Sequence, residues 1–510
     1  MGGLRKVIKM VDLVRYLMEC GFELRVPSCP EELFLRDVTQ DSRKVEQGAL
    51  FCCVTGCRAD GHDYAEEAVA KGAAALLCER PLDIPLPQII VGDVRRAMGH
   101  AASAVHGFPC EKLQLLAVTG TNGKSTSAYL IRHLLAEAGR RSGLIGTIVY
   151  SDGRCDVEAD RTTPENCDIH RWLARMVEAG CDSCVMETSS HGLEQGRLAG
   201  CLFDRALFTN LTPEHLDYHG DMENYFASKS RLFSEYMKPG WKGAVNVDDP
   251  YGARLHDRWP DQLMPFSLKA DVERGLRVER RRMDISGLTL DIRFPDGRSV
   301  EGLHVPLMGN FNVYNTAGAL ALVETLSLKE SDLKVAMRRI PQVPGRMERY
   351  CFRNGSCAVV DYAHSPDALE NVLTALREVT EGRIFAVFGL GGERYVENRP
   401  AMGAIAASLA DFVLITSDNP RSENPREIAR QIAVGIEGIS RSVPYAIEID
   451  RKKAVFQALS MAHAGDVVLI GGKGPERFIL FSDHKEPYND TETVLEWARL
   501  NGEVGELPLR

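Results

Sequence analysis

Leu113-Gln-Leu-Leu-Ala-Val-Thr119, followed by Gly120-Thr-Asn-Gly-Lys-Ser-Thr126, is the stretch of sequence that decides the fold. The first seven residues form an apolar run of strand length, and the next seven form a glycine-containing loop. Apolar residues then recur at helical spacing from Lys124 to Ala138, and Gly139 stands where a helix C-cap is expected. The sequence therefore predicts the order strand, loop, helix.

A loop between a buried strand and a helix can bind phosphate, because its N–H groups and the positive end of the helix converge on the anion. Lys124 would neutralise terminal phosphates, and the Ser125 hydroxyl suits Mg²⁺. Val118 stands where the general motif has its first glycine, so a glycine turn that caps a helix is the alternative. ATPase, kinase, transporter motor and ligase all remain open at this point. The residues predicted to bind ATP are Gly120, Thr121, Asn122, Gly123, Lys124, Ser125 and Thr126.

Apolar runs and helical segments alternate on both sides of this loop, which predicts an α/β protein with mainly parallel sheets. A small α/β domain is expected over residues 1–110 and a central phosphate-loop domain over 111–343. After the prolines at 341 and 344 the alternation restarts, so a Rossmann-like third domain is expected over 344–510. The expected strands are 49–54, 73–78, 184–186, 206–208, 244–247, 358–360, 384–388, 412–415 and 467–470. The expected helices are 64–71, 367–379, 400–410, 426–436 and 451–463.

Composition limits the class of protein. A chain of 510 residues suggests about three domains, and 44% hydrophobic with 26% charged residues is typical of a globular protein. We find no apolar run that could cross a bilayer and no export signal at the N-terminus, so we expect a cytoplasmic monomer. The net charge of −10 argues against nucleic acid as a partner. We expect the 14 scattered cysteines to be reduced thiols.

Two polar segments follow expected strands of the central domain. Glu187 comes at the carboxyl end of one strand, where a metal-binding carboxylate would face the phosphate loop, but a helix cap is an equally good interpretation. His215 and His219, four residues apart, resemble a zinc helix. Zinc is the weaker interpretation, because the HExxH pattern is missing.

Six motifs occur in the order found in the Mur ligase family: GTNGKST, ETSSHGLEQGR, NLTPEHLDYHG, MENYFASKSRLF, GNFNVYN and VVDYAHSPDAL. The chain resembles this family over nearly its whole length, and most of all the members that add a diamino acid to a UDP-linked muramoyl dipeptide in peptidoglycan synthesis. The resemblance implies that ATP phosphorylates a substrate carboxylate and that an amine attacks the acyl phosphate. No enzyme nucleophile is then needed, so catalysis rests on positioning and charge neutralisation.

The resemblance also implies a metal site and two substrate pockets. Ser125 and Glu187 would hold one Mg²⁺, and Glu187, His215 and a carbamylated Lys229 would hold a second. A solvated lysine on an amphipathic helix is the alternative for Lys229. The residues matching the pocket for the UDP-muramoyl dipeptide are Gln40, Ser42, Cys57, Arg58, Ala59, Thr162, Thr163, Ser189, Gln195 and Arg197. Thr163 would also serve as the N-cap of a helix that begins at Pro164.

The nucleotide and the amino acid would contact later motifs. Asn310, Asn312 and Asn315 would lie against the adenine nucleotide, and Asp361 and His364 would reach it by closure of the third domain. The residues expected to bind the amino acid are Arg394, Asp418, Asn419, Pro420, Arg421, Gly472 and Glu476.

The segment Asp418-Asn-Pro-Arg421 is associated in the family with meso-diaminopimelate, because an arginine can form a two-pronged contact with the distal carboxylate that lysine lacks. Arg421 could instead pair with Glu423. The chain departs from the usual pattern at Glu393, Tyr395 and Pro475. Lysine or another diamino acid as substrate, a folylpolyglutamate-synthase-like ligase and a regulatory phosphate-loop ATPase therefore stay open as alternatives.

Overall fold

The computed structural model describes residues 7–56, 59–270, 272, 274–324, 329–393, 396–441 and 443–504. The chain divides into two compact units, residues 1–277 with 315–327 and residues 278–314 with 328–510, and each is described by itself. Within the described ranges, every helix is too short or too polar to cross a bilayer.

The first unit begins with a five-stranded sheet in the order β2-β7-β6-β5-β4, parallel except for the pair β2 and β7. Its strands are β2 (Leu24–Arg25), β4 (Asp37–Thr39), β5 (Ala49–Cys52), β6 (Ala73–Cys78) and β7 (Gln88–Val91). Helices α1 (Met10–Glu19) and α3 (Val94–Val105) pack on one face and α2 (Ala65–Ala70) on the other. A separate short antiparallel pair is formed by β1 (Ile8–Lys9), which precedes α1, and β3 (Phe34–Leu35), which lies between β2 and β4 in the sequence. The expected small α/β arrangement is confirmed.

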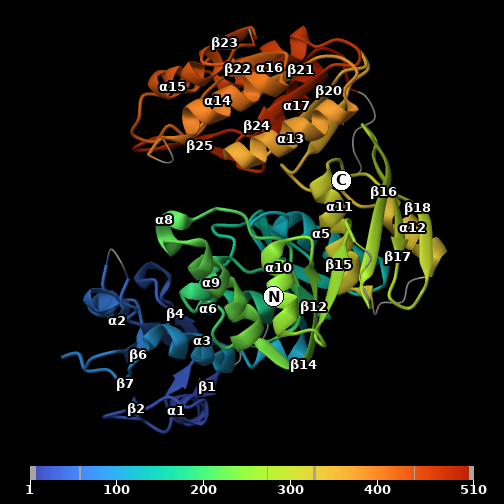
Figure 1. Cartoon of the computed structure of the whole chain (residues 1–510). Helices are drawn as coiled ribbons and strands as arrows, with labels where there is room; N and C mark the ends of the chain where they lie inside the picture. Colours follow the sequence, from blue (N-terminus) through green and yellow to red (C-terminus); the bar gives the residue numbers. More distant parts are fainter. Residues whose placement is uncertain are drawn as a thin grey trace. The chain divides into compact units, whose positions relative to one another are not determined.

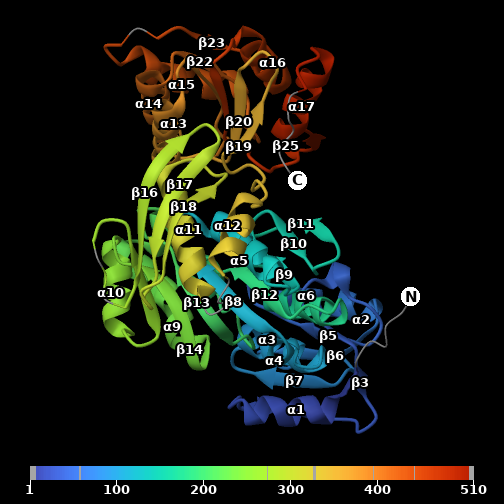
Figure 2. The same cartoon turned by 90° about the vertical axis from the view of Figure 1, so that its right-hand side faces the viewer.

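The second sheet of this unit has the order β11-β10-β9-β12-β8-β13-β14-β15-β16. Figure 1 labels the strands β14, β15 and β16, and Figure 2 shows β8 between β12 and β13. Its strands are β8 (Gln114–Thr119), β9 (Ser142–Ile145), β10 (Val149–Ser151), β11 (Asp156–Glu158), β12 (Ser183–Glu187), β13 (Phe203–Phe208), β14 (Met237–Asn246), β15 (Leu263–Ser267) and β16 (Leu276–Asp284). Only Leu276 and Arg277 of β16, which pair with β15, belong to this unit. The run from β9 to β16 is parallel, and β8 and β12 are buried along nearly their whole length, as their continuous apolar sequences predict.

Helices connect these strands in the order that the sequence predicts. They are α4 (Pro109–Lys112), α5 (Lys124–Glu137), α6 (Asn166–Glu178), α7 (Ser190–Glu194), α8 (Leu216–His219), α9 (Met222–Glu235), α10 (Pro250–Arg258) and α11 (Asn310–Leu322), whose residues from Asn315 onward belong to the first unit. Helix α5 follows β8 directly, and Figure 2 shows both among the cyan elements beside α6. The predicted strand, loop and helix are therefore confirmed.

The second unit contains an antiparallel hairpin, β17 (Gly287–Arg293) with β18 (Ser299–Val305), helix α12 (Glu330–Arg338) and a six-stranded sheet in the order β19-β20-β24-β21-β22-β23. The sheet strands are β19 (Glu348–Cys351), β20 (Cys357–Asp361), β21 (Ile384–Phe388), β22 (Phe412–Ile415), β23 (Tyr445–Ile447) and β24 (Val467–Gly471), and all but β19 are parallel. The small pair β25 (Phe478–Leu480) and β26 (Lys485–Pro487) is antiparallel.

Helices cover both faces of the six-stranded sheet. α13 (Pro366–Val379), α14 (Asn398–Leu409) and α15 (Pro425–Glu437) pack on one face, and α16 (Arg451–Met461) and α17 (Asp490–Leu500) pack on the other. Alternate residues along each strand face the two layers, so both faces are apolar. The expected Rossmann-like arrangement is confirmed, while the domain boundaries at 110 and 343 stay predictions.

One expectation about the cysteines is wrong. Cys351 and Cys357 are direct partners in the antiparallel pair of β19 and β20, with a Cα–Cα distance of 4.2 Å, and the structure joins them by a disulfide. Strand register brings these two residues together, and their spacing of six in the sequence does not reveal it. The other cysteines that the structure describes are free thiols.

Candidate functional site

The phosphate loop has the backbone that anion binding requires. Gly120 and Gly123 have φ values of +144° and +82°, so side chains at these positions would be strained. A Cβ at Gly123 would also lie 2.1 Å from Asn315 Oδ1. Lys124 Nζ donates hydrogen bonds to the carbonyls of Gly120 (3.0 Å) and Thr121 (2.7 Å), which folds the lysine back along the loop.

Glu187 ends β12 beside this loop and is fully buried. The Ser125 hydroxyl donates to its carboxylate at 3.0 Å, and Thr147 donates through both its backbone N–H and its hydroxyl, each at 3.0 Å. The helix that follows is capped by Ser189, which accepts from the Gly192 N–H, so the segment does contain the helix cap of the alternative interpretation, while Glu187 itself ends the strand. Thr147 was missed at the sequence level, because it lies in a short loop that carries no recognisable motif.

Lys229 lies inside the unit with 1% of its surface exposed. Its Nζ donates to the Gly120 carbonyl at 2.8 Å and lies 4.8 Å from the centre of the Tyr225 ring. Burial, together with the charge of Lys124, holds the pKa of Lys229 well below its usual value. The alternative of a solvated surface lysine is therefore wrong.

His215 has a left-handed backbone, with φ +57°, at the start of α8. Burial lowers its pKa, Glu214 opposes this, and Lys124 and Lys229 lower it further. The structure thus brings His215 near both lysines, and the acidic group it places against the imidazole is Glu214, at 3.8 Å.

Histidine and tyrosine rings gather beside His215. His191 lies 4.8 Å from His215 and 4.2 Å from Tyr218, measured between ring centres. Burial and the neighbouring His215 and His219 lower the pKa of His191 to about 4. His219 Nε2 lies 3.0 Å from the Ser190 hydroxyl. His191 was not singled out from the sequence, although its motif was.

Five of the residues expected to contact the muramoyl dipeptide form one connected group. Thr163 donates to the Glu187 carbonyl at 2.9 Å and accepts from the backbone N–H of Ser189 at 3.0 Å. Arg197 donates to the Thr163 carbonyl (2.9 Å) and to the side chain of Gln195 (2.6 Å). Thr162 joins them through Thr147, at 3.0 Å between hydroxyls. These side chains therefore adjoin the carboxylate of the expected metal site.

The expected helix start at Pro164 is wrong. Helix α6 begins at Asn166, and Glu165 occupies the N-cap position. Thr163 cannot cap the helix, because its hydroxyl is bonded to Glu187 and Ser189. Glu165 instead forms ion pairs with three arginines, Arg95 (2.5 Å), Arg161 (2.8 Å) and Arg197 (3.4 Å). Of these, only Arg197 was predicted as a site residue from the sequence. Three guanidinium groups around one carboxylate leave an excess of positive charge at this place.

In the N-terminal part, Gln40 has a buried side-chain oxygen that accepts no hydrogen bond from the described residues. Ser42 donates to Glu67 at 2.9 Å, and Ala59 is exposed. Cys57 and Arg58 lie outside the described residues.

The asparagines of α11 differ in their surroundings. Asn315 lies against the phosphate loop, where its Oδ1 also receives a hydrogen bond of 3.5 Å from Ser127. Asn312 donates to the Met308 carbonyl at 2.7 Å, and Asn310 is exposed. The expected proximity to the phosphate loop is thus observed for Asn315.

In the second unit, Asp361 is buried at the end of β20 and accepts from the backbone N–H groups of Met347 (2.7 Å) and Ala363 (2.8 Å). Burial raises the pKa of Asp361. His364 is exposed, and its Nδ1 lies 2.8 Å from the Tyr362 carbonyl.

The side chain of Arg421 is aimed at the loop that follows β21. Its guanidinium donates to the Gly392 carbonyl at 2.5 Å, and its backbone has φ +52°. Glu423 pairs with Arg399, at 2.8 Å and 3.0 Å, so the alternative pairing of Arg421 with Glu423 is wrong. Among the described residues, no carboxylate forms an ion pair with Arg421.

Asn419 and Glu476 are joined by Lys473. Lys473 Nζ donates to Asn419 Oδ1 (3.0 Å) and to Glu476 Oε2 (2.8 Å), and Asn419 donates to the same Glu476 oxygen at 2.8 Å. Asp418 is buried, which raises its pKa, and its Oδ2 accepts no hydrogen bond from the described residues. A Cβ at Gly472 would lie 2.7 Å from that oxygen, so glycine leaves room beside Asp418.

Two of the three departures from the family pattern can be placed. The Glu393 backbone N–H donates to Glu423, and Glu393 has φ +61°. Pro475 packs against Gly345, where a Cβ would lie 2.3 Å from the proline nitrogen. Pro420 belongs to the same region, since a Cβ at Gly392 would meet its carbonyl at 2.1 Å. Arg394 and Tyr395 lie outside the described residues.

Comparison with known proteins defines the class. Residues 35–107 match the model described as Mur ligase family, catalytic domain, residues 118–323 the Mur ligase middle domain, and residues 345–474 the Mur ligase, glutamate ligase domain. A relative from Aquifex aeolicus is 40% identical over 92% of this chain and 95% of its own length, and one from Thermosynechococcus vestitus is 41% identical over 92% and 94%. The chain therefore belongs to the Mur ligase family of ATP-dependent ligases.

Both relatives carry the name UDP-N-acetylmuramoyl-L-alanyl-D-glutamate–2,6-diaminopimelate ligase. A solved structure with the same name is 29% identical, with a TM-score of 0.68 over 97% of this chain and 99% of that one. The D-alanyl-D-alanyl ligase from Acinetobacter baumannii, at 17% identity, shares the fold with a TM-score of 0.65 over 92% of this chain and 96% of its own.

Proposed function

We propose that this protein is the ligase that joins meso-diaminopimelate to the D-glutamate carboxylate of UDP-N-acetylmuramoyl-L-alanyl-D-glutamate, with ATP as the energy source, in peptidoglycan synthesis. The observation that carries the proposal is the direct contact of Ser125 with Glu187, beside the group formed by Thr163, Ser189 and Arg197. This contact supports the proposal, because the residues expected to bind ATP then adjoin those expected to bind the dipeptide. The names of the relatives support the choice of substrates.

The reaction would proceed in two steps. A carboxylate oxygen of the D-glutamate attacks the γ-phosphorus of ATP, which gives an acyl phosphate and ADP. The amine of the diamino acid then attacks the acyl carbon, the amide bond forms, and phosphate leaves with the proton of the amine passing to solvent. Lys124 neutralises the phosphates, and Arg197 with Thr163 and Ser189 holds the dipeptide, so the chain acts by positioning and charge.

The residues present fit Mg²⁺. Mg²⁺ prefers oxygen ligands, and the Ser125 hydroxyl and the buried Glu187 carboxylate offer two oxygens in direct contact at the end of β12. We propose that Ser125 and Glu187 hold one Mg²⁺, and that Glu187, His215 and carbamylated Lys229 hold a second. Bound Mg²⁺ would neutralise charge on the transferred phosphoryl group.

Arg421 supports diaminopimelate as the amino acid. Its guanidinium is half-buried and without a carboxylate partner among the described residues, so the distal carboxylate of diaminopimelate would supply one. Glu476, with its side chain one-third exposed, would accept the distal ammonium. Because the reaction uses ATP, we place the protein in the cytoplasm, and we propose that it acts as a monomer.

Product mass tests the proposal directly. The protein is incubated with ATP, Mg²⁺ and UDP-muramoyl dipeptide, with diaminopimelate or lysine, and the products are weighed by mass spectrometry. We expect the mass of the diaminopimelate adduct, and phosphate release only when dipeptide and amine are both present. A lysine adduct of equal yield would overturn the choice of amino acid. Phosphate release without either acceptor would instead favour a regulatory ATPase.

A further inference from the structure

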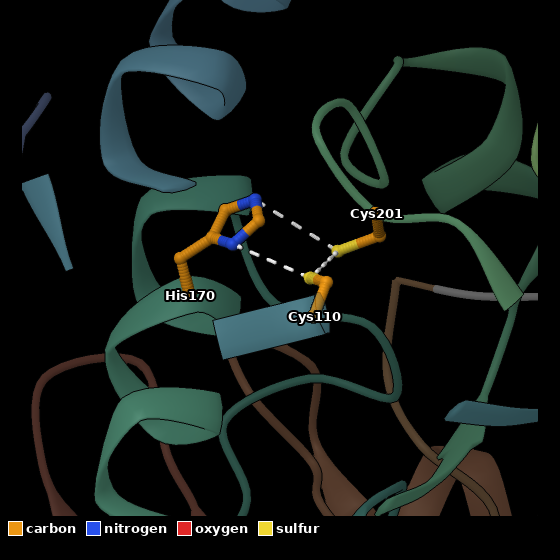
Figure 3. A group of neighbouring side chains, drawn as sticks. All are labelled: Cys110, His170 and Cys201. Atoms are coloured by element: carbon orange, nitrogen blue, oxygen red, sulfur yellow. Dashed lines mark hydrogen bonds between the residues drawn. The ribbon is translucent and has the colours of Figure 1, made fainter. Parts of the chain in front are cut away.

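Cys110, His170 and Cys201 form a buried cluster in the first unit that the proposed ligase reaction does not use. Cys110 lies on α4, His170 on α6, and Cys201 in the segment that leads from α7 to β13. Their exposed fractions are 5%, 0% and 1%. Figure 3 shows both sulfurs facing the same imidazole ring. The cluster was not expected from the sequence, because its members are 60 and 31 residues apart.

The distances within the cluster suit a tetrahedral metal centre. The two sulfurs are 3.7 Å apart, His170 Nδ1 lies 3.7 Å from Cys110 Sγ, and His170 Nε2 lies 3.8 Å from Cys201 Sγ. One ligand atom from each of the three side chains lies within 4.8 Å of the other two. Two thiolates bound to Zn²⁺ at about 2.3 Å in a tetrahedron are separated by about 3.8 Å, and a thiolate and an imidazole nitrogen by about 3.6 Å. One ring nitrogen binds one cation, so the sulfur–sulfur and Cys110–Nδ1 separations match as they stand, and Cys201 Sγ would move toward Nδ1 when the cation binds.

Charge selects the kind of cation. Two thiolates and a neutral imidazole carry two negative charges, which a divalent cation cancels, whereas a monovalent cation such as Cu⁺ would leave one charge buried. The described residues place no fourth His, Cys, Asp or Glu in the cluster. The Ala199 carbonyl lies 3.2 Å from His170 Nε2 and would accept its N–H, which leaves Nδ1 as the nitrogen that binds the cation. Thiolate and imidazole are ligands that zinc prefers over Mg²⁺.

We propose that Cys110, His170 and Cys201 form a structural binding site for Zn²⁺. The cation would fix α4 and α6 to the segment before β13, which follows the residues proposed to bind the dipeptide. Gly99 of α3 already packs closely on this segment, since a Cβ there would lie 2.3 Å from the Ala199 carbonyl. Among the described residues, the three side chains contact none of those proposed to bind ATP. We therefore expect loss of the site to lower the stability of the protein more than its reaction rate.

Metal analysis of the full-length protein tests the site. Because all three side chains are buried, the metal is supplied during folding, by expression in minimal medium with Zn²⁺ and Cu²⁺ together, or with Co²⁺ alone. After a chelator wash, we expect about one zinc per chain by plasma mass spectrometry. The cobalt protein is expected to show thiolate-to-cobalt charge-transfer bands. This spectrum is recorded on the wild-type protein, so it does not depend on whether a variant folds.

Variants assign the metal to the cluster. Cys110→Ala, Cys201→Ala and His170→Asn are each expected to lose the zinc, whereas Cys167→Ala keeps it, because Cys167 is buried on the same helix as His170 but lies outside the cluster. Less than about a tenth of a zinc per chain would overturn the proposal. Zinc retained in the Cys110→Ala/Cys201→Ala protein, copper in place of zinc, or a Cys110–Cys201 disulfide in the peptide map would also overturn it.

Discussion

Two buried lysines, Lys229 in the first unit and Lys473 in the second, have opposite surroundings. Lys473 donates to the carboxylate of Glu476 and to Asn419. Lys229 donates to a backbone carbonyl and lies over an aromatic ring, and no acidic side chain forms an ion pair with it among the described residues. Both are almost fully enclosed, with 0% and 1% of their surface exposed. The two therefore differ in partner and hardly at all in burial.

The difference teaches what burial does to an amine. Enclosure penalises the charged form, and a neighbouring carboxylate compensates for that penalty while a carbonyl does so only in part. The pKa of Lys229 is accordingly lowered, and a neutral amine is the form that can attack CO₂ and become a carbamate. The first region thus favours a neutral lysine beside the phosphate loop, and the second holds a lysine that contacts both Asn419 and Glu476.

Replacing Lys229 should have the largest effect. Lys229→Met removes the group proposed to carry the carbamate, so we expect kcat to fall by about 10²–10³-fold, as when one charge-stabilising group is lost from a transition state. The measurement is the rate of product formation with saturating substrates. A carbon-13 signal from labelled bicarbonate should appear in the wild-type protein, vanish in Lys229→Arg and persist in Lys473→Arg. A signal that survives in Lys229→Arg would contradict the assignment.

The second region is tested through Arg421. Arg421→Ala leaves the distal carboxylate of diaminopimelate without its partner, so we expect kcat/KM for diaminopimelate to fall by about 5–150-fold, equivalent to about 1–3 kcal/mol. The value for lysine should change much less. Glu423→Gln is the matched control, because Glu423 pairs with Arg399 and not with Arg421. An unchanged preference between the two amino acids in Arg421→Ala would disprove the role.

A smaller loss of kcat is expected when Thr147, which orients the Glu187 carboxylate, is replaced. Thr147→Val keeps the shape of the side chain and the backbone hydrogen bond but removes the hydroxyl that donates to Glu187. We expect kcat to fall by about tenfold, the value of one hydrogen bond to a charged group, with a weaker apparent affinity for Mg²⁺. Titration of the rate with Mg²⁺ measures both. Thr147→Ser should restore the wild-type values, and failure to do so would mean that packing is responsible.

Much of the fold follows from local patterns in the sequence. The apolar run before Gly120 and the helical spacing after it predict β8 and α5 almost to the residue, since both are decided by neighbours in the chain. Alternating runs likewise predict the strands and helices of the second unit. The helix start at Thr163 fails, because its hydroxyl is taken by Glu187 and Ser189, which are distant in sequence.

The site is predictable only where a motif marks it. Ser125 and Glu187 were expected from their positions after strands and Lys229 from the family resemblance, and the structure brings them to the same loop. Thr147 has no motif around it. The partner of Glu423 depends on how α14 packs against α15, and the register of β19 and β20 pairs Cys351 with Cys357. Such contacts arise from tertiary packing between segments distant in the sequence, so local sequence patterns cannot predict them.

The smallest expected effect is a pH dependence of stability that separates the two lysines. In the unfolded chain Lys229 keeps its proton up to a pKa of about 10.4, whereas the folded chain releases that proton at a much lower pH. Between the two pKa values the unfolded state binds more protons, so the free energy of unfolding rises with pH across this window. Lys229→Met removes this contribution. The free energy of unfolding of Lys229→Met should therefore exceed that of the wild-type protein most at low pH. The difference should shrink as the pH approaches about 10.

Urea unfolding at several pH values in CO₂-free buffer measures the difference in free energy of unfolding between Lys229→Met and the wild-type protein. Lys44→Met is the control for the loss of a surface lysine. CO₂ must be excluded, because carbamate formation would stabilise the wild-type protein through the same nitrogen. If the stabilities of wild type and Lys229→Met stay parallel from neutral to alkaline pH, the lysine is charged in the folded state. The contrast with Lys473 would then lie in hydrogen bonding alone, and carbamate formation at Lys229 would lose its physical basis.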